Sequence, residues 1–292
     1  MSEQHVTLGD GCRLAYRFDG PEDAPVLLLS NSLGTRMEMW DAQMAAFAAR
    51  FRVLRYDSRG HGASDAPAGA YGLDRLGRDV VELLDALGLE RVAFCGLSLG
   101  GMVGQWLGVR APERLERLVL ANTSAFMGPP SAWDARIASA LSQGMALLAA
   151  ASVARWFTPV FAAHAPDPVA VIEAGLLATS PQGYAGCCAA IRDMDLRRLG
   201  GLITTPTLVI SGAADPATPP DHANDAPDFT TTATMCTSPA RGATEVRTPG
   251  LIRLPTFLSA DRRPSCAPPA NAATVWSPVT VSSSNRPTHT IV

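Results

Sequence analysis

The stretch Arg91–Gly104, with the sequence RVAFCGLSLGGMVG, decides the fold of this chain. Its first half, Arg91–Leu97, is an apolar run typical of a buried strand, and a helical pattern begins at Leu99. Between the two, residues 96–100 form the pattern G-x-S-x-G. A strand, this pattern and a helix in that order hold a serine hydroxyl clear of a sheet, at the N-terminus of the helix. We therefore predict that Ser98 is a nucleophile; the alternative is a serine in a purely structural turn.

Apolar runs on either side of this stretch predict a mostly parallel sheet. The predicted strands are Val26–Asn31, Phe51–Ser58, Arg91–Leu97, Leu115–Asn122 and Thr205–Gly212, preceded by a hairpin of His5–Leu8 and Arg13–Phe18. Helical patterns separate them over Met37–Ala49, Asp74–Leu87 and Leu99–Arg110. Strands and helices that alternate at this spacing form a parallel sheet with helices on both faces. The predicted fold class is therefore α/β.

The alternation stops between Asn122 and Thr205. Four helical patterns follow one another there, over Ser131–Ala150, Ser152–Ala163, Pro168–Thr179 and Pro181–Met194. An uninterrupted helical insertion in an α/β chain predicts a cap that lies over one edge of the sheet. We accordingly divide the chain into a first part of the core (1–122), a helical cap (123–204), the returning strand with its loop (205–222) and a tail (223–292).

The tail has a different composition from the rest of the chain. It is rich in Pro, Ser and Thr, and its clearest apolar patch, Leu251–Leu258, is split by Pro255. This composition is typical of an irregular or disordered segment. Two interpretations are open, a natural flexible tail or a reading frame that has shifted near Ala223. In the second case the last strand and helix of the core are missing, and Thr205–Gly212 becomes an uncovered edge of the sheet.

Composition excludes several classes of function. The chain has 24 basic and 27 acidic residues and a formal net charge of −3, which argues against a nucleic-acid-binding surface. Its apolar runs are too short to predict a membrane span. It contains no phosphate loop, dinucleotide fingerprint or metal-binding cluster, so we expect no cofactor. The six cysteines form no CxxC pair, and Cys187–Cys188 is interpreted as a buried pair on a helix. We expect a reduced, cytoplasmic protein of undetermined oligomeric state.

A serine nucleophile needs hydrogen-bond donors for the oxyanion that forms during acyl transfer. One predicted donor is the backbone N–H of Leu99, directly after Ser98. The other is the N–H of Leu33, in the loop after the strand Val26–Asn31; an ordinary Asn/Ser/Gly turn is the alternative for this loop.

The nucleophile also needs a base and an acid that orients the base. Asp215, after the strand Thr205–Gly212, is the predicted acid, with a helix cap as the alternative and Asp221 as a weaker candidate. His61 lies in the turn 57–64, and we interpret it as a structural histidine rather than as the base.

Residues 1–222 resemble the α/β-hydrolases, in which the catalytic serine precedes the acid in the chain. Within that superfamily the chain resembles the 3-oxoadipate enol-lactonases. The segments that carry this closer likeness are Ser30–Thr35, Tyr56–Ser64, Gly96–Gly101, Ala121–Thr123 and the long, unusual Gly183–Asp195 in the cap.

The resemblance implies hydrolysis of an enol-lactone in the β-ketoadipate pathway of aromatic catabolism. Ser98 would attack the lactone carbonyl, and water would then release 3-oxoadipate from the acyl-enzyme. Because this substrate carries a free carboxylate, its pocket should hold a cation. Arg136 and Arg192 are the candidates, and Trp133 is a candidate wall for the ring; each could equally be a surface or core residue.

The resemblance also implies a catalytic histidine about 25–35 residues after the acid. The corresponding window, Ala240–Gly250, contains no histidine. His222 follows Asp215 too closely, and His289 lies near the end of the tail. Because the mismatch begins abruptly near Ala223, we favour the shifted reading frame, and we expect a poorly active, marginally stable protein. Sequencing the gene again tests this hypothesis.

Two alternative functions remain open. One is another reaction on the same fold, that of a carboxylesterase or a cofactor-free perhydrolase. The other is a non-catalytic binding protein that keeps the pocket, which the missing histidine favours. If the chain is an enol-lactonase or another hydrolase, the expected partner is a small lactone or ester. We expect neither a nucleic acid nor a membrane as a partner.

Overall fold

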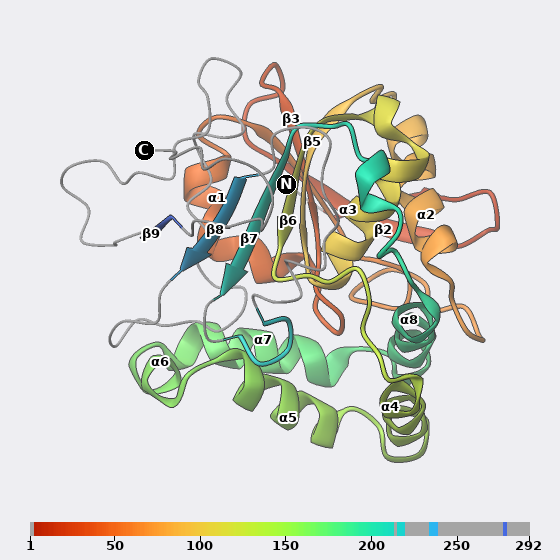
Figure 1. Cartoon of the computed structure of the whole chain (residues 1–292), viewed down its shortest axis with the longest axis vertical. Helices are drawn as coiled ribbons and strands as arrows, with labels where there is room; N and C mark the ends of the chain where they lie inside the picture. Colours follow the sequence, from red (N-terminus) through yellow and green to blue (C-terminus); the bar gives the residue numbers. More distant parts are fainter. Residues whose placement is uncertain (1–2, 213–214, 220–233, 239–276, 279–292) are drawn as a thin grey trace, which may run out of the picture.

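A computed structural model describes residues 3–212, 215–219, 234–238 and 277–278 (Figure 1). Its strands form one sheet in the order β1-β2-β4-β3-β5-β6-β7-β8-β9. The strands are β1 (Gln4–Thr7), β2 (Arg13–Asp19), β3 (Val26–Ser30), β4 (Arg52–Tyr56), β5 (Val92–Leu97), β6 (Leu115–Ala121), β7 (Thr207–Gly212), β8 (Thr234–Ser238) and β9 (Ser277–Pro278). Strands from β4 to β8 pair in parallel, while β1, β2 and β9 join antiparallel. The predicted α/β fold with a mostly parallel sheet is confirmed.

The central strands β3 and β5 are mostly apolar because both faces of the sheet are covered. Leu28 and Phe94 point into one cluster with the helices α2 (Leu73–Ala86) and α3 (Leu99–Arg110). Their neighbours Leu27 and Ala93 point into the opposite cluster with α1 (Asp41–Phe47). Figure 1 shows α1 on one side of the sheet and α2 and α3 on the other.

The predicted helix Met37–Ala49 is divided in the structure. Its first turn is a 3-10 helix, Met37–Trp40, and α1 follows it directly. Two further short 3-10 helices, Pro112–Arg114 and Gly200–Leu202, connect the remaining elements.

The cap consists of five helices rather than the predicted four. They are α4 (Pro130–Gln143), α5 (Ala146–Trp156), α6 (Pro159–His164), α7 (Pro166–Ala178) and α8 (Pro181–Asp193). The predicted helix Ser131–Ala150 breaks at Gly144, which has a positive φ. The predicted helix Ser152–Ala163 is also divided, because a new helix begins at Pro159. The Thr158 side chain caps this helix by accepting a hydrogen bond from the Phe161 N–H.

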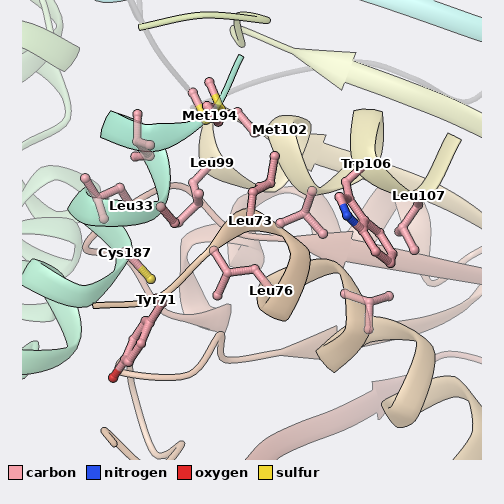
Figure 2. Close-up of a cluster of buried hydrophobic side chains, with 14 of the residues drawn as sticks. Leu33, Tyr71, Leu73, Leu76, Leu99, Met102, Trp106, Leu107, Cys187 and Met194 are labelled. Atoms are coloured by element: carbon pink, nitrogen blue, oxygen red, sulfur yellow. The ribbon is translucent and has the colours of Figure 1, made fainter. Parts of the chain in front are cut away.

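The cap lies at the carboxyl ends of the parallel strands. In Figure 1 the arrowheads of β7 and β8 point toward α6 and α7. A cluster of buried side chains joins the cap to the core. It includes Leu33 of the loop after β3, Leu99 of α3 and Cys187 of α8 (Figure 2). Cys187 and Cys188 are both fully buried on α8, as predicted.

The expectation that β7 forms an uncovered edge is wrong. β8 pairs with β7 in parallel, with Leu208 opposite Thr234 and Gly212 opposite Ser238. An open strand edge offers a row of backbone N–H and C=O groups, and the short run Thr234–Ser238 supplies their partners. The tail therefore contributes two strands, β8 and β9. The remaining predictions for residues 223–292 lie outside the described residues.

Among the described residues, no helix is both long enough and apolar enough to cross a bilayer.

Candidate active site

Ser98 stands at the turn between β5 and α3 in a strained backbone conformation. Its φ of 53° and ψ of −112° lie outside the regions that L-residues ordinarily adopt. A Cβ on Gly96 would collide with the backbone of Gly100, and a Cβ on Gly100 would collide with the carbonyl group of Ser30. Both glycines of the motif are therefore required by close backbone approach. Ser98 is half-buried, and its hydroxyl makes no hydrogen bond with the described residues.

Hydrogen bonds between strand ends link the Ser98 turn to the neighbouring strands. The Ser98 N–H donates to the carbonyl of Ala121 at 2.9 Å, and the Thr123 hydroxyl donates to the Ser98 carbonyl at 2.7 Å. The Asn122 N–H then donates to the carbonyl of Ile210 at 2.7 Å. The ends of β5, β6 and β7 are thus fixed to one another at the edge where ligands bind in parallel sheets.

The loop after β3 lies against the start of α3. The Gly100 N–H donates to the carbonyl of Asn31 at 3.0 Å. The side chain of Asn31 is held in turn, because its amide group donates to the Tyr56 carbonyl at 2.8 Å and accepts from Trp40 Nε1 at 2.9 Å. The loop is therefore a rigid neighbour of Ser98.

In the loop 32–35, the N–H of Leu33 has no acceptor among the described residues, whereas the other three N–H groups have one. The N–H of Ser32 points to the sulfur of Met39, that of Gly34 to His61, and that of Thr35 to the carbonyl of Ser32. The N–H of Leu99, the first residue of α3, likewise has no acceptor among the described residues. The structure therefore leaves the two predicted oxyanion donors, Leu33 and Leu99, without an internal partner.

Asp215 is buried after β7 and its carboxylate accepts four hydrogen bonds. One oxygen accepts from the N–H groups of Ala217 at 2.8 Å and Thr218 at 3.2 Å. The other accepts from the Asn122 amide at 2.7 Å and from the Thr218 hydroxyl at 2.9 Å. The two bonds to N–H groups a few residues later have capping geometry, which was the alternative interpretation of this residue. The bond to Asn122 also places the carboxylate beside the end of β6.

His61 is a structural residue of the turn after β4. It is 1% exposed, and its Nε2 accepts the Gly34 N–H at 2.8 Å. Its Nδ1 lies 3.2 Å from the carbonyl of Arg59. Burial lowers the pKa of the imidazole to about 4, so the ring is neutral at pH 7. Since both ring nitrogens are engaged with backbone groups, the geometry agrees with the prediction that His61 is not the base.

Two further histidines belong to the described part of the chain. His5 contacts the carbonyl of Ala63, and His164 contacts the carbonyl of Val160 on its own helix; both are exposed. His222 and His289 lie outside the described residues, as do Asp221 and the window Ala240–Gly250.

Arg136 and Trp133 lie on α4 and belong to one cluster in the cap. The Arg136 guanidinium lies over the rings of Trp133 and Tyr184, at 5.6 and 5.8 Å from the ring centroids. It donates to the Tyr184 hydroxyl at 2.6 Å and approaches the Ser152 hydroxyl at 3.5 Å. Trp133 is buried and donates to the carbonyl of Met127. No carboxylate in the described residues pairs with Arg136.

Arg192, the other predicted carboxylate-binding cation, already has anionic partners. Its guanidinium pairs with Asp134 at 2.8 Å and with Asp193 at 2.7 Å. These two carboxylates satisfy most of its N–H donors. Of the two predicted arginines, Arg136 is therefore the better placed to bind a substrate carboxylate.

The comparisons with known proteins agree with this geometry. Residues 25–240 match the family model of the alpha/beta hydrolase fold. The chain belongs to the α/β-hydrolase family. It is 44% identical to 3-oxoadipate enol-lactonase 2 of Acinetobacter baylyi over 205 residues, which are 70% of this chain and 77% of that protein.

Two solved structures also resemble this α/β-hydrolase. A hydrolase from Pseudomonas aeruginosa PA01 is 50% identical, with a TM-score of 0.79 and coverage of 82% of this chain and 91% of that one. The enol-lactonase from Burkholderia xenovorans LB400 is 41% identical, with a TM-score of 0.77 and coverage of 80% and 90%. The predicted resemblance to enol-lactonases is confirmed.

A cation of the α/β-hydrolase that was not predicted from the sequence also lies in the cap, near Arg136. Arg155 lies on α5, one turn after Ser152, and is half-buried. Burial, and then the like charge of Arg136, lower the pKa of its guanidinium, while Tyr184 and Asp215 act in the opposite direction. The described residues include no ion-pair partner for it. Its spacing of three residues from Ser152 is the signal that could have placed it on the same helix face as Ser152.

Asn122 is the second residue that was missed as a part of the site. It was noted within Ala121–Thr123 without a role, yet it has a positive φ of 43° and binds Asp215. Its position directly after the buried strand β6 is the available sequence signal. Within the described residues, no group of His, Cys, Asp and Glu could hold a metal ion.

Proposed function

We propose that this α/β-hydrolase site is built to hydrolyse 3-oxoadipate enol-lactone to 3-oxoadipate. The observation that carries the proposal is the strained Ser98 turn, with the unpartnered N–H groups of Leu99 and Leu33 beside it. The similarity to enol-lactonases supports this substrate over other esters.

Each residue has a defined role in the proposed reaction. The Ser98 oxygen attacks the lactone carbonyl, the C–O bond of the ring breaks, and the acyl group stays on Ser98. The released enol oxygen gains a proton in place of the one that the Ser98 hydroxyl loses. Leu33 and Leu99 donate to the oxyanion of the tetrahedral intermediate. Water then hydrolyses the acyl-enzyme and releases 3-oxoadipate.

Two arginines of the cap serve the substrate's carboxylate in this proposal. Arg136 and Arg155 bring two positive charges together, and neither has a carboxylate partner in the described structure. A bound carboxylate would relieve the repulsion between them. Trp133, packed beside Arg136, would cover the ring.

The acid and the missing base set the expected rate. Asp215 is fixed beside the end of β6, but the sequence holds no histidine between His222 and His289. Without an imidazole to take its proton, Ser98 stays a protonated alcohol, and residual acceleration comes from oxyanion donors and binding, typically about 10³–10⁴ over water. We therefore expect slow turnover by the purified chain.

The experiment measures loss of the enol-lactone and formation of 3-oxoadipate by the purified chain, by Ser98→Ala and by Ser142→Ala. Ser142 is an exposed α4 residue that bonds its own helix, so its variant is a matched control. We expect slow hydrolysis that Ser98→Ala abolishes and Ser142→Ala retains. Turnover that survives in Ser98→Ala, or a preference for simple p-nitrophenyl esters over the lactone, would count against the proposal.

A further inference from the structure

Gly34, the residue after the proposed oxyanion donor Leu33, is held on both sides of its backbone. Its N–H donates to His61 Nε2 at 2.8 Å, and its carbonyl accepts from the Thr179 hydroxyl at 2.9 Å. Its φ is +80°, and a Cβ there would collide with Leu176 of the cap. The core holds one side of this residue and the cap holds the other.

His61 Nε2 can accept a hydrogen bond only in the neutral tautomer that carries its proton on Nδ1. Because Nε2 accepts the Gly34 N–H, the ring proton lies on Nδ1, where it is donated to the carbonyl of Arg59. Arg59 is itself fixed, since its buried guanidinium pairs with Asp79 at 2.5 Å and with Asp10 at 2.8 Å. The imidazole therefore belongs to a rigid turn, and its Nε2 faces the loop after β3.

The bond to His61 holds the residue next to the free N–H of the loop. With Gly34 bound to His61 and Thr35 bound to Ser32, the N–H of Leu33 is left without an acceptor in the described structure. The Leu33 N–H belongs to the Ser32–Leu33 peptide, which meets the held Leu33–Gly34 peptide at the Leu33 Cα. If the bond to His61 is lost, the buried Gly34 N–H is left without its acceptor, and a shift of the loop that relieves this cost displaces the Leu33 N–H as well. A donor must be preorganised toward the oxyanion to lower the barrier.

We propose that His61 is a positioning residue that holds Gly34, and with it the neighbouring Leu33, in place, so that the Leu33 N–H points at the acyl oxygen of a substrate on Ser98. This inference rests on the proposed function of Ser98. It gives the buried imidazole a role in transition-state stabilisation, rather than in proton transfer or packing alone.

Two variants separate the acceptor from the bulk of the side chain. His61→Leu fills a similar volume but accepts no hydrogen bond, whereas His61→Gln retains an acceptor oxygen. His164→Leu is the matched control, because the imidazole it removes is exposed and contacts a carbonyl of its own helix. Circular dichroism and thermal melting establish that each variant is folded before it is compared.

The first readout is Ser98-dependent hydrolysis of p-nitrophenyl acetate. We expect His61→Leu to lower kcat by about 10- to 100-fold at unchanged KM, the effect of a displaced oxyanion donor. His61→Gln should recover most of the kcat, and His164→Leu should retain all of it. Equal losses in folded His61→Leu and His61→Gln, or no loss in either, would overturn the proposal.

The second readout does not depend on turnover. Nitrogen-15 NMR of the full chain should show an unprotonated Nε2 and a protonated Nδ1 for His61, and a slowly exchanging Gly34 amide. That protection should disappear in His61→Leu and return in His61→Gln. A protonated Nε2, or a Gly34 amide that exchanges equally slowly in His61→Leu, refutes the inference. Hydrolysis that does not depend on Ser98 would instead contradict the proposed function, and the NMR result would then decide the role of His61 in holding the loop.

Discussion

The buried imidazole of His61 makes the stability of this protein depend on pH in a way that one substitution removes. Burial lowers its pKa from 6.5 to about 4 in the folded state. The unfolded chain therefore binds a proton between these pH values that the folded chain rejects, and unfolding takes up that proton. The sign follows directly: stability falls as the pH falls from about 6.5 to about 4, and it is fully retained above 6.5.

The size of the effect follows from the same two pKa values. Their separation corresponds to about 3 kcal/mol of unfolding free energy between pH 7.5 and pH 4. Asp57 opposes this trend, because burial raises the pKa of its carboxyl to about 6, so that its contribution falls as the pH rises. Asp57 is present in both proteins when the wild type is compared with His61→Gln, so its contribution cancels in their difference.

Urea titration at several pH values between 4 and 7.5 measures this difference. We expect the unfolding free energy of the wild type relative to His61→Gln to decrease by about 3 kcal/mol over this range. The m-values of the two proteins should agree, which shows that the same surface is exposed on unfolding. A constant difference between the two proteins across the range would refute the reasoning, because His61 would then titrate alike in both states.

Two further predictions follow from the packing of the site. Gly100→Ala forces a methyl group against the Ser30 carbonyl, so we expect the unfolding free energy from urea titration to drop by about 2 kcal/mol or more. Gly72→Ala, where a Cβ meets open space, should leave it nearly unchanged, and equal losses would contradict the steric explanation. Arg155→Gln should weaken calorimetrically measured binding of adipate, an unreactive dicarboxylate, by about tenfold. Arg192 is already paired with Asp134, so Arg192→Gln should not weaken the binding. Equal weakening in both variants would show that adipate responds to the overall charge of the protein rather than to Arg155.

Much of the fold was predictable because its signals are local. A strand buried on both faces must be apolar at successive positions, as residues 26–29 and 92–95 are. The helix boundaries at Gly144 and Thr158 were missed, although a positive-φ glycine and a capping threonine are also local signals. The pairing of β8 with β7 was missed for another reason, because nothing in the composition of Thr234–Ser238 shows which open edge it will meet.

The sequence by itself determined the position of the candidate nucleophile. Only a strand, small flanking residues and a helix permit the strained turn at Ser98, and all of these lie within about 20 consecutive residues. The tertiary structure alone decided which N–H groups remain free and which arginine lacks a partner. The Gly34 N–H binds His61 of the turn after β4, whereas the neighbouring Leu33 N–H has no acceptor among the described residues, and the surroundings of Arg155 are made by side chains of other elements. A hydrogen bond or ion pair is a property of two groups that the fold brings together, so neither segment alone contains it.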